Sequence, residues 1–308
     1  MIRFRYREKG SIIHRLNPFC KLAWLVSILV LALLLDHPIP LIALFISTLL
    51  IACAADIKRE WLSFMKFLPF LIFAIILINA LLSYHGETVL WKAPFHIPVM
   101  GQPEITREAI IYGLGMSLRL AAIISAFAVI TLTVHPDDIM LSLIKMRLPY
   151  KSVLVTSLSA RFMPTLIDDA ERITDVQRSR ALELERGRLH QRIRRRMSIL
   201  VPLLANSLDR TVQVAEAMDS RAFGGGSGRT YYREIRFSPV DVITVIAALA
   251  PLALGIFIAL AGYGSYQYYP STGSINLSAE GWLAIVSLFV LLCAPVPLGL
   301  LKKEIDLD

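Results

Sequence analysis

Long apolar runs constrain this sequence more than any other feature. A helix needs about 20 largely apolar residues to cross the hydrocarbon core of a bilayer, which is about 30 Å thick. Six runs approach that length, at residues 18–35, 40–55, 64–83, 110–134, 240–261 and 282–301. The second is short, and prolines at 38 and 40 indicate a tight turn before it. The pattern predicts an all-α membrane protein with about six transmembrane helices.

The charges lie between these runs, which reconciles two features of the composition. The chain is 56% hydrophobic, more than a soluble domain, yet its net charge is +8. Of 32 lysines and arginines, 29 fall in segments 1–21, 56–66, 135–238 and 302–308. Only Lys92 and Arg107 fall in the loops on the opposite side of the membrane. The three short segments, without 135–238, carry 11 lysines and arginines, against 2 in the loops on the opposite side. The positive-inside rule therefore predicts a multi-pass protein of the cell membrane with both termini in the cytoplasm.

The polar segment 135–238 separates two groups of apolar runs. We therefore predict a four-span bundle at 1–134, a cytoplasmic region at 135–238 and a two-span hairpin at 239–308. Within the cytoplasmic region, apolar residues recur at steps of three and four and predict two long amphipathic helices, at about 152–183 and 197–222. Small residues on the second helix favour a close crossing, and the glycines at 224–228 end it.

Each of these helices ends in the same tripeptide. The first carries Ser179, Arg180 and Ala181, and the second carries Ser220, Arg221 and Ala222. An arginine in a last helical turn interacts favourably with the helix dipole, which is one interpretation. The other is a pair of docking tips, because a guanidinium between small residues can enter a narrow groove and meet a carboxylate with two hydrogen bonds. The repetition of the tripeptide favours docking.

A basic segment joins the two helices. Its six arginines are Arg186, Arg188, Arg192, Arg194, Arg195 and Arg196. Nucleic-acid binding is disfavoured, because aromatic residues are not interleaved and no nucleic-acid module is recognisable. Contact with anionic lipid headgroups is favoured, and contact with a protein partner stays open.

Arg119 is a charge deep inside the run 110–134, about 15 Å from its start at 1.5 Å per residue. A charge at such a depth costs at least about 2.5 kcal/mol, so we expect it to face other helices or water. Asn79 and backbone carbonyls are the candidate partners. A switch and a structural staple of the bundle both remain open as its role.

The sequence carries no recognisable catalytic chemistry. "FGGGSGRT" lacks the lysine and the spacing of a phosphate loop, and no Cys/His spacing fits a metal site. We expect no enzyme activity, cofactor or metal in this chain, so that ATP, if it drives transport, binds to another subunit. A stand-alone channel or carrier is disfavoured because the spans offer few polar groups. A membrane-embedded enzyme is disfavoured because they carry no paired acids and no nucleophile with a base.

Several motifs together resemble one family. "IIHRLNPFCKLAW", with Pro18 and Lys21, "GLGMSLRLAAI", with Arg119, and "VPLLANSLDRTVQVAEAMDSRAFG" are similar to the transmembrane T-component of energy-coupling factor (ECF) ABC transporters, the EcfT/CbiQ family. The resemblance runs from about residue 11 to 240 and includes Arg161 and Pro164.

The resemblance implies a function. In this family two crossing coupling helices end in Ala-Arg-Gly-type motifs, each docked on one subunit of an ATPase dimer. Here both tips keep the arginine, with serine in place of alanine and alanine in place of glycine. ATPase closure is then passed to a separate membrane S-component, which holds a vitamin or a cobalt or nickel ion. The S-component chooses the substrate, so this chain does not name it.

Overall fold

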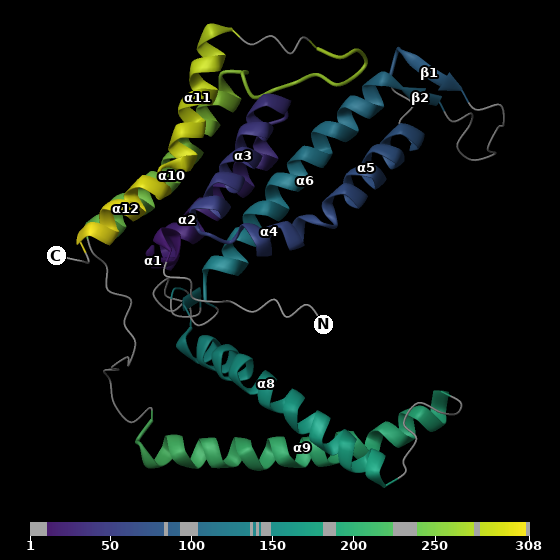
Figure 1. Ribbon diagram of the computed structural model, residues 1–308, viewed down its shortest axis with the longest axis vertical. Helices are drawn as coiled ribbons and strands as arrows, with labels where there is room; N and C mark the ends of the chain where they lie inside the picture. The colour runs from purple at the N-terminus through teal and green to yellow at the C-terminus, as the bar shows by residue number, and fades with distance from the viewer. Residues whose placement is uncertain are drawn as a thin grey trace. The chain divides into compact units, whose positions relative to one another are not determined.

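The computed structural model describes residues 11–82, 86–92, 104–135, 138–139, 142, 149–180, 189–223, 239–273 and 278–305. The contacts within the chain divide it into two compact units. The membrane unit comprises Met1–Ile139 with Arg236–Asp308, and the two-helix unit comprises Met140–Ile235. The described residues are mostly helical (Figure 1), so the prediction of an all-α membrane protein is confirmed.

The membrane unit is built mainly from apolar helices. Its helices are α1 (Ile12–Arg15), α2 (Pro18–Leu34), α3 (Pro38–Ala54), α4 (Lys58–Met65), α5 (Leu68–Leu82), α6 (Arg107–Thr133), α10 (Pro239–Leu260), α11 (Ala279–Cys293) and α12 (Pro295–Ile305). Within the described ranges, four helical segments are long and apolar enough to cross a membrane: Lys58–Leu81, Arg107–Thr133, Pro239–Leu260 and Ala279–Leu301. The remaining two predicted spans, α2 and α3, have 17 residues each.

Local sequence fixes where these helices begin. Proline occupies the first position of α2 and of α3, where its missing N–H costs nothing and its φ suits a helix. The Asn17 side chain accepts a hydrogen bond from the backbone N–H of Phe19 at 3.1 Å. Thr106 caps α6 and Ser278 caps α11 in the same manner. Each cap satisfies a backbone donor that a helix start leaves without a partner.

Helix α6 is the centre of the membrane unit. In α6, 56% of the 18-residue apolar stretch is buried inside the protein, against 17% of the corresponding stretch in the α4–α5 segment. Polar side chains join it to its neighbours in the apolar interior. Ser125 on α6 contacts Thr48 of α3 (Oγ–Oγ1 2.6 Å) and accepts the Trp61 indole N–H from α4 at 2.9 Å. Such bonds are needed because a buried polar group without a partner is costly.

Two short strands lie before α6. β1 (Val89–Lys92) and β2 (Glu104–Thr106) pair antiparallel, with Lys92 opposite Glu104. This hairpin lies near the start of α6 and the end of α5 (Figure 1). The Leu90 and Trp91 side chains are exposed, a composition typical of a segment at a membrane–water boundary.

The loop after α10 folds back onto the turn between α2 and α3. The Gly264 carbonyl accepts hydrogen bonds from the backbone N–H groups of Asp36 (2.9 Å) and His37 (3.0 Å). The Tyr268 hydroxyl donates to the Asp36 carbonyl at 2.8 Å. Burial raises the pKa of Tyr268 to about 12, so this hydroxyl stays a protonated donor at neutral pH. The loop backbone is therefore tied down by polar contacts that do not depend on pH near neutrality.

The two-helix unit consists of α8 (Tyr150–Ser179) and α9 (Leu189–Ser220). The first helix was predicted at 152–183 and the second at 197–222. The second start is wrong by eight residues, because the arginine-rich stretch at 192–196 is helical and belongs to α9. These residues were predicted to join the two helices, but arginine has a good helix propensity and extends α9 instead. A short helix predicted between Asp137 and Pro149 falls largely outside the described residues.

Candidate functional site

The α9 tip ends in a Schellman motif, which the repeated tripeptide itself builds. Ser220 is the last helical residue and Arg221 follows it. The Phe223 N–H bonds to the Met218 carbonyl at 3.0 Å, and the Ala222 N–H bonds to the Asp219 carbonyl at 2.8 Å. These are the two bonds that define the motif. Its closing position requires positive φ, and Ala222 has φ 51°.

This geometry explains the third position of the tripeptide. A left-handed conformation costs an L-residue about 1–2 kcal/mol, whereas glycine adopts it freely. The resemblance described above has glycine where this chain has Ala222. The α9 tip therefore keeps a glycine-type backbone turn with an alanine in it, at a local cost that the motif's two hydrogen bonds offset. No feature of the sequence alone predicts this positive φ.

The α8 tip has its tripeptide in the same register. Ser179 is the last helical residue, and Arg180 is the C-cap, with its N–H bonded to the Val176 carbonyl at 3.2 Å. Ala181 lies outside the described residues. Both serine hydroxyls turn back to a carbonyl of their own helix, Ser179 to Asp175 at 2.7 Å and Ser220 to a residue three positions earlier at 3.0 Å.

The two tip arginines are exposed, and among the described residues neither has an ion-pair partner. Because the flanking serine hydroxyls are already bonded, the guanidinium groups of Arg180 and Arg221 are the remaining strong donors at the tips. A guanidinium presents five N–H groups in a planar fork that fits a carboxylate. Each tip is thus chemically suited to meet an acidic group of a partner.

The helices α8 and α9 cross, and the crossing directs the tips apart. Arg210 of α9 bonds Asp169 of α8 at 3.2 Å, and the Gln177 amide of α8 donates to the Ser198 carbonyl of α9 at 3.4 Å. Because the later residue of one helix faces the earlier residue of the other, the two run antiparallel at the crossing (Figure 1). At 1.5 Å per residue, the tips therefore lie on the order of 30 Å apart.

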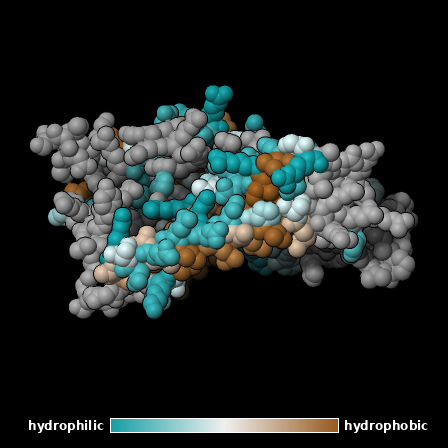
Figure 2. All heavy atoms as spheres, turned by 90° about the horizontal axis from the view of Figure 1, so that it is seen from below, coloured by the Kyte–Doolittle hydropathy of each residue, from teal (hydrophilic) through white to brown (hydrophobic). Residues whose placement is uncertain are grey.

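The helix α9 exposes an apolar stripe besides its contact with α8. Its members are Met197, Leu200, Val201, Leu204, Leu208 and Val212. Five of them follow one another at steps of three and four, and Leu200 lies next to Val201, so all six share one helix face. Figure 2 shows hydrophobic and hydrophilic residues in separate bands. Exposed apolar areas of this kind mark contact sites for proteins or membranes.

The basic segment is only partly described. Arg186 and Arg188 lie outside the described residues, and for Arg192, Arg194 and Arg195 only the helical backbone is described. Arg196 is exposed on α9. The roles predicted for these arginines therefore remain predictions.

Arg119 pairs with a residue that the sequence analysis did not name. Its guanidinium donates to the Asp36 carboxylate at 2.5 Å and to the Leu35 carbonyl at 3.1 Å. The prediction of a backbone carbonyl is confirmed and that of Asn79 is wrong, since the Asn79 amide donates to the Ile75 carbonyl of its own helix. Arg119 is 18% exposed and Asp36 is 55% exposed.

The length of α2 and α3 explains this pairing. Seventeen residues make a helix of about 25 Å, whereas the 27 residues of α6 span about 40 Å. The α2–α3 turn that carries Asp36 therefore lies beside the middle of α6 and not beside its end. The short second run and the tight turn before it are the sequence features that could have indicated this partner, but only together with the packing of α2 and α3 against α6.

Among the described residues, no group of three or more His, Cys, Asp or Glu side chains is arranged to hold a metal ion. The two-helix unit presents two arginine tips that diverge from a helix crossing, and an apolar stripe on α9. Together with the apolar bundle they define a membrane protein that carries a two-helix element suited to binding partner subunits.

Comparison with known proteins identifies the family. Residues 9–232 match the family CbiQ, described as cobalt transport protein, and this chain belongs to that family. The protein named energy-coupling factor transporter transmembrane protein EcfT of Streptococcus thermophilus is 32% identical over 255 residues, 80% of this chain and 94% of its own length. Proteins of the same name from Listeria innocua (31% identical, 80% and 94% covered) and Thermotoga maritima (29%, 86% and 96%) are also similar. The resemblance drawn from the sequence is confirmed.

Proposed function

We propose that this chain is the transmembrane energy-coupling subunit of an ECF-type ABC importer. One observation carries the proposal: the repeated tripeptide occupies the same register at the ends of two crossing helices, in a chain of the CbiQ family. A helix-dipole role would not require the same serine–arginine pair at both ends. Two equivalent docking tips account for the repetition.

Each tip docks on one of two ATPase subunits. Arg180 and Arg221 enter grooves on these subunits and meet carboxylates there. ATP binds to the ATPases and not to this chain, which supplies no catalytic group. The tips leave the crossing in opposite directions, and each contacts one ATPase subunit. Closure of the ATPase pair therefore moves both helices at the same time.

The membrane unit spans the cell membrane with both termini in the cytoplasm. The charge asymmetry of the loops supports this orientation. It places the two-helix unit on the cytoplasmic side, where ATP is available. The basic segment at 186–196 then faces the anionic lipid headgroups of the inner leaflet.

A separate membrane S-component carries the substrate, which is a vitamin or a cobalt or nickel ion. The apolar stripe of α9 supports this partner, because six large apolar side chains exposed on one face of a helix match the apolar surface of a membrane protein. Motion of α9 then reorients the S-component and releases the substrate inside the cell.

A pull-down of the ATPases tests the proposal. The double variant Arg180→Glu with Arg221→Glu places like charge against an acidic groove, so it should abolish ATPase recruitment while the membrane unit stays folded. The variant Arg194→Ala, Arg195→Ala and Arg196→Ala, which changes the basic segment instead, is the control. Recruitment by the double variant at the wild-type level would refute docking by the tips. Loss of recruitment in the control alone would assign docking to the basic segment.

A further inference from the structure

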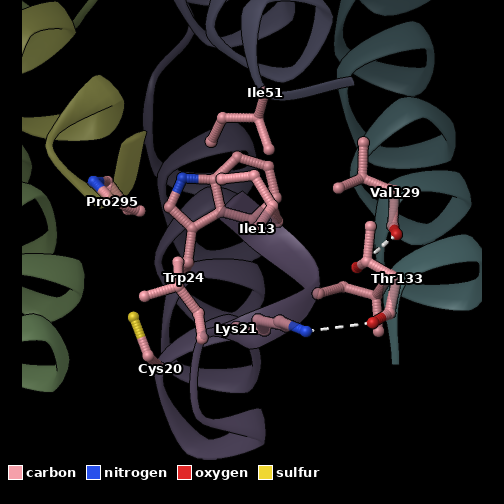
Figure 3. Close-up of a pocket in the computed structure, with 10 residues that line it drawn as sticks. Ile13, Cys20, Lys21, Trp24, Ile51, Val129, Thr133 and Pro295 are labelled. Atoms are coloured by element: carbon pink, nitrogen blue, oxygen red, sulfur yellow. Dashed lines mark hydrogen bonds between the residues drawn. The ribbon is translucent and has the colours of Figure 1, made fainter. Parts of the chain in front are cut away.

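Lys21 is a buried cation in the membrane unit that the proposed function does not use. It lies in the first turn of α2 and is 6% exposed. Its side chain borders a cavity of about 20 Å³ (Figure 3). The side chains around this cavity include those of Ile13, Trp24, Ile51 and Val129. This surrounding is largely apolar, so an ammonium group here needs a specific reason.

The contacts of the ammonium group supply that reason. Its Nζ donates to the Thr133 carbonyl at 2.9 Å and to the His14 carbonyl at 3.1 Å. Thr133 is the last residue of α6, and His14 is in the last turn of α1. Carbonyls at a helix C-terminus have no N–H partner within the helix and carry partial negative charge. Lys21 therefore joins the ends of three helices through one charged group.

Thr133 lies where the chain passes from the membrane unit toward the two-helix unit, so this contact can transmit movement between them. The chain leaves α6 at this residue, and the two-helix unit begins at Met140. The Val134 N–H still bonds to the Ile130 carbonyl at 2.9 Å, so the helix stays closed up to the contact. An apolar side chain would fill the same space without desolvating a charge, but it would leave the Thr133 carbonyl without this donor.

We propose that Lys21 is a positioning residue that anchors the C-terminal end of α6 to α1 and α2, so that movement of the two-helix unit is passed to the membrane unit. This inference rests on the proposed energy-coupling function. Without the ammonium group, the last turn of α6 opens and absorbs the movement locally. Movement of α8 and α9 then no longer reaches α1 and α2.

Hydrogen exchange in the assembled complex with both ATPases tests this inference, with and without AMP-PNP. In the wild type, the nucleotide changes exchange in α8 and α9 and also in α1 and α2. In Lys21→Met, the response of α8 and α9 persists, and that of α1 and α2 is lost. Exchange at residues 130–134 also rises about tenfold without nucleotide, as expected for the loss of a charged hydrogen bond. Lys21→Arg keeps the charge and retains the response of α1 and α2.

The control is Lys66→Met, the same substitution at an exposed lysine of the membrane unit, which should behave as the wild type. If Lys21→Met does not assemble, Lys21→Gln, which keeps N–H donors without the charge, is measured in its place with the same expected loss. An unchanged response of α1 and α2 in either uncharged variant overturns the inference. A wild-type complex whose α8 and α9 do not respond to AMP-PNP refutes the energy-coupling function itself, and the inference with it.

Discussion

Exposed apolar side chains have different meanings in the two units. In the membrane unit, α5 exposes Phe70 and Phe73 by 71% and 64%, and the 15-residue helix carries no charged residue. In the two-helix unit, α9 exposes Leu208 by 65%, but the next residue is an exposed aspartate, Asp209. The exposed fractions are alike. The α5 surface is apolar throughout and suits contact with lipid. The exposed apolar residues of α9 form a narrow stripe beside charged residues, which suits contact with another protein.

The polar groups show the same contrast. In the membrane unit, serine, threonine and tryptophan side chains bond to neighbouring helices, as at Ser125, because lipid offers no alternative partner. In the two-helix unit, Ser179 and Ser220 bond to their own helices and the adjacent arginines point to solvent. The membrane unit satisfies its polar groups internally, whereas the two-helix unit leaves both strong donors and apolar area for other chains.

We expect the largest effect from substitution of the tip arginines. We expect Arg221→Ala to weaken ATPase binding by about 2–5 kcal/mol, because it strands an acidic partner in a desolvated contact. Arg221→Lys should recover only part of the loss, since lysine lacks the planar fork. Affinity is measured with purified ATPases and the chain in lipid nanodiscs. Arg178→Ala is the matched control, because Arg178 forms only an exposed pair with Asp175 at 3.9 Å. Equal losses at Arg178 and Arg221 would contradict a specific tip contact.

We expect the second-largest effect from a substitution in the α9 stripe. Leu208→Asp places a charge in the apolar stripe and should cost the S-component contact about 2 kcal/mol, the value of a buried leucine side chain. Asn206→Asp adds the same charge two residues away, at an exposed position on the face opposite the stripe, and should be neutral. The measurement is the amount of S-component that co-purifies from native membranes. If both variants retain the S-component equally, the stripe is not its contact surface.

Arg119 tests the membrane unit. As a staple, Arg119→Ala should lower the free energy of unfolding by about 1–2 kcal/mol, a value reduced by the exposure of Asp36. Thermal unfolding of the purified chain in detergent measures the loss, and Arg119→Lys should lose less. ATPase recruitment should be unchanged. An unaltered unfolding temperature together with lost ATP-driven uptake would instead identify Arg119 as a switch.

The smallest expected effect is a gain. Ala222→Gly removes the cost of a positive φ and should stabilise the α9 tip by about 1 kcal/mol. Ala205→Gly, at an exposed position in the interior of the same helix, should destabilise α9 by about the same amount. Hydrogen exchange of residues 189–223 distinguishes the two. Destabilisation by both glycines would show that the Schellman turn is not formed in solution.

The sequence predicted the membrane helices well and their partners poorly. Apolar length and proline positions are local signals, so the starts of α2 and α3 were predicted within two residues. The pairing of Arg119 with Asp36 depends on how far the short α2–α3 hairpin reaches beside α6, which is a property of packing. Asn79 was the wrong choice because it lies in a neighbouring span but bonds to its own helix.

The tips illustrate the same limit at a smaller scale. The repeated tripeptide was visible in the sequence, and its register at the two helix ends agrees with that reading. The positive φ of Ala222 was not visible, because alanine gives no signal for a left-handed turn. The contact of Lys21 with the Thr133 carbonyl was also hidden, since a backbone acceptor leaves no mark in the sequence.

Photo-crosslinking from the two tips shows whether they dock on the ATPase subunits. A photoreactive residue replaces Arg180 in one variant and Arg221 in another, and each is irradiated in native membranes with the ATPases present. We expect both positions to crosslink to ATPase subunits, whereas the same residue at Asn206, on the face of α9 opposite the apolar stripe, does not. Crosslinks to the ATPases from Arg196 but from neither tip would contradict docking by the tips.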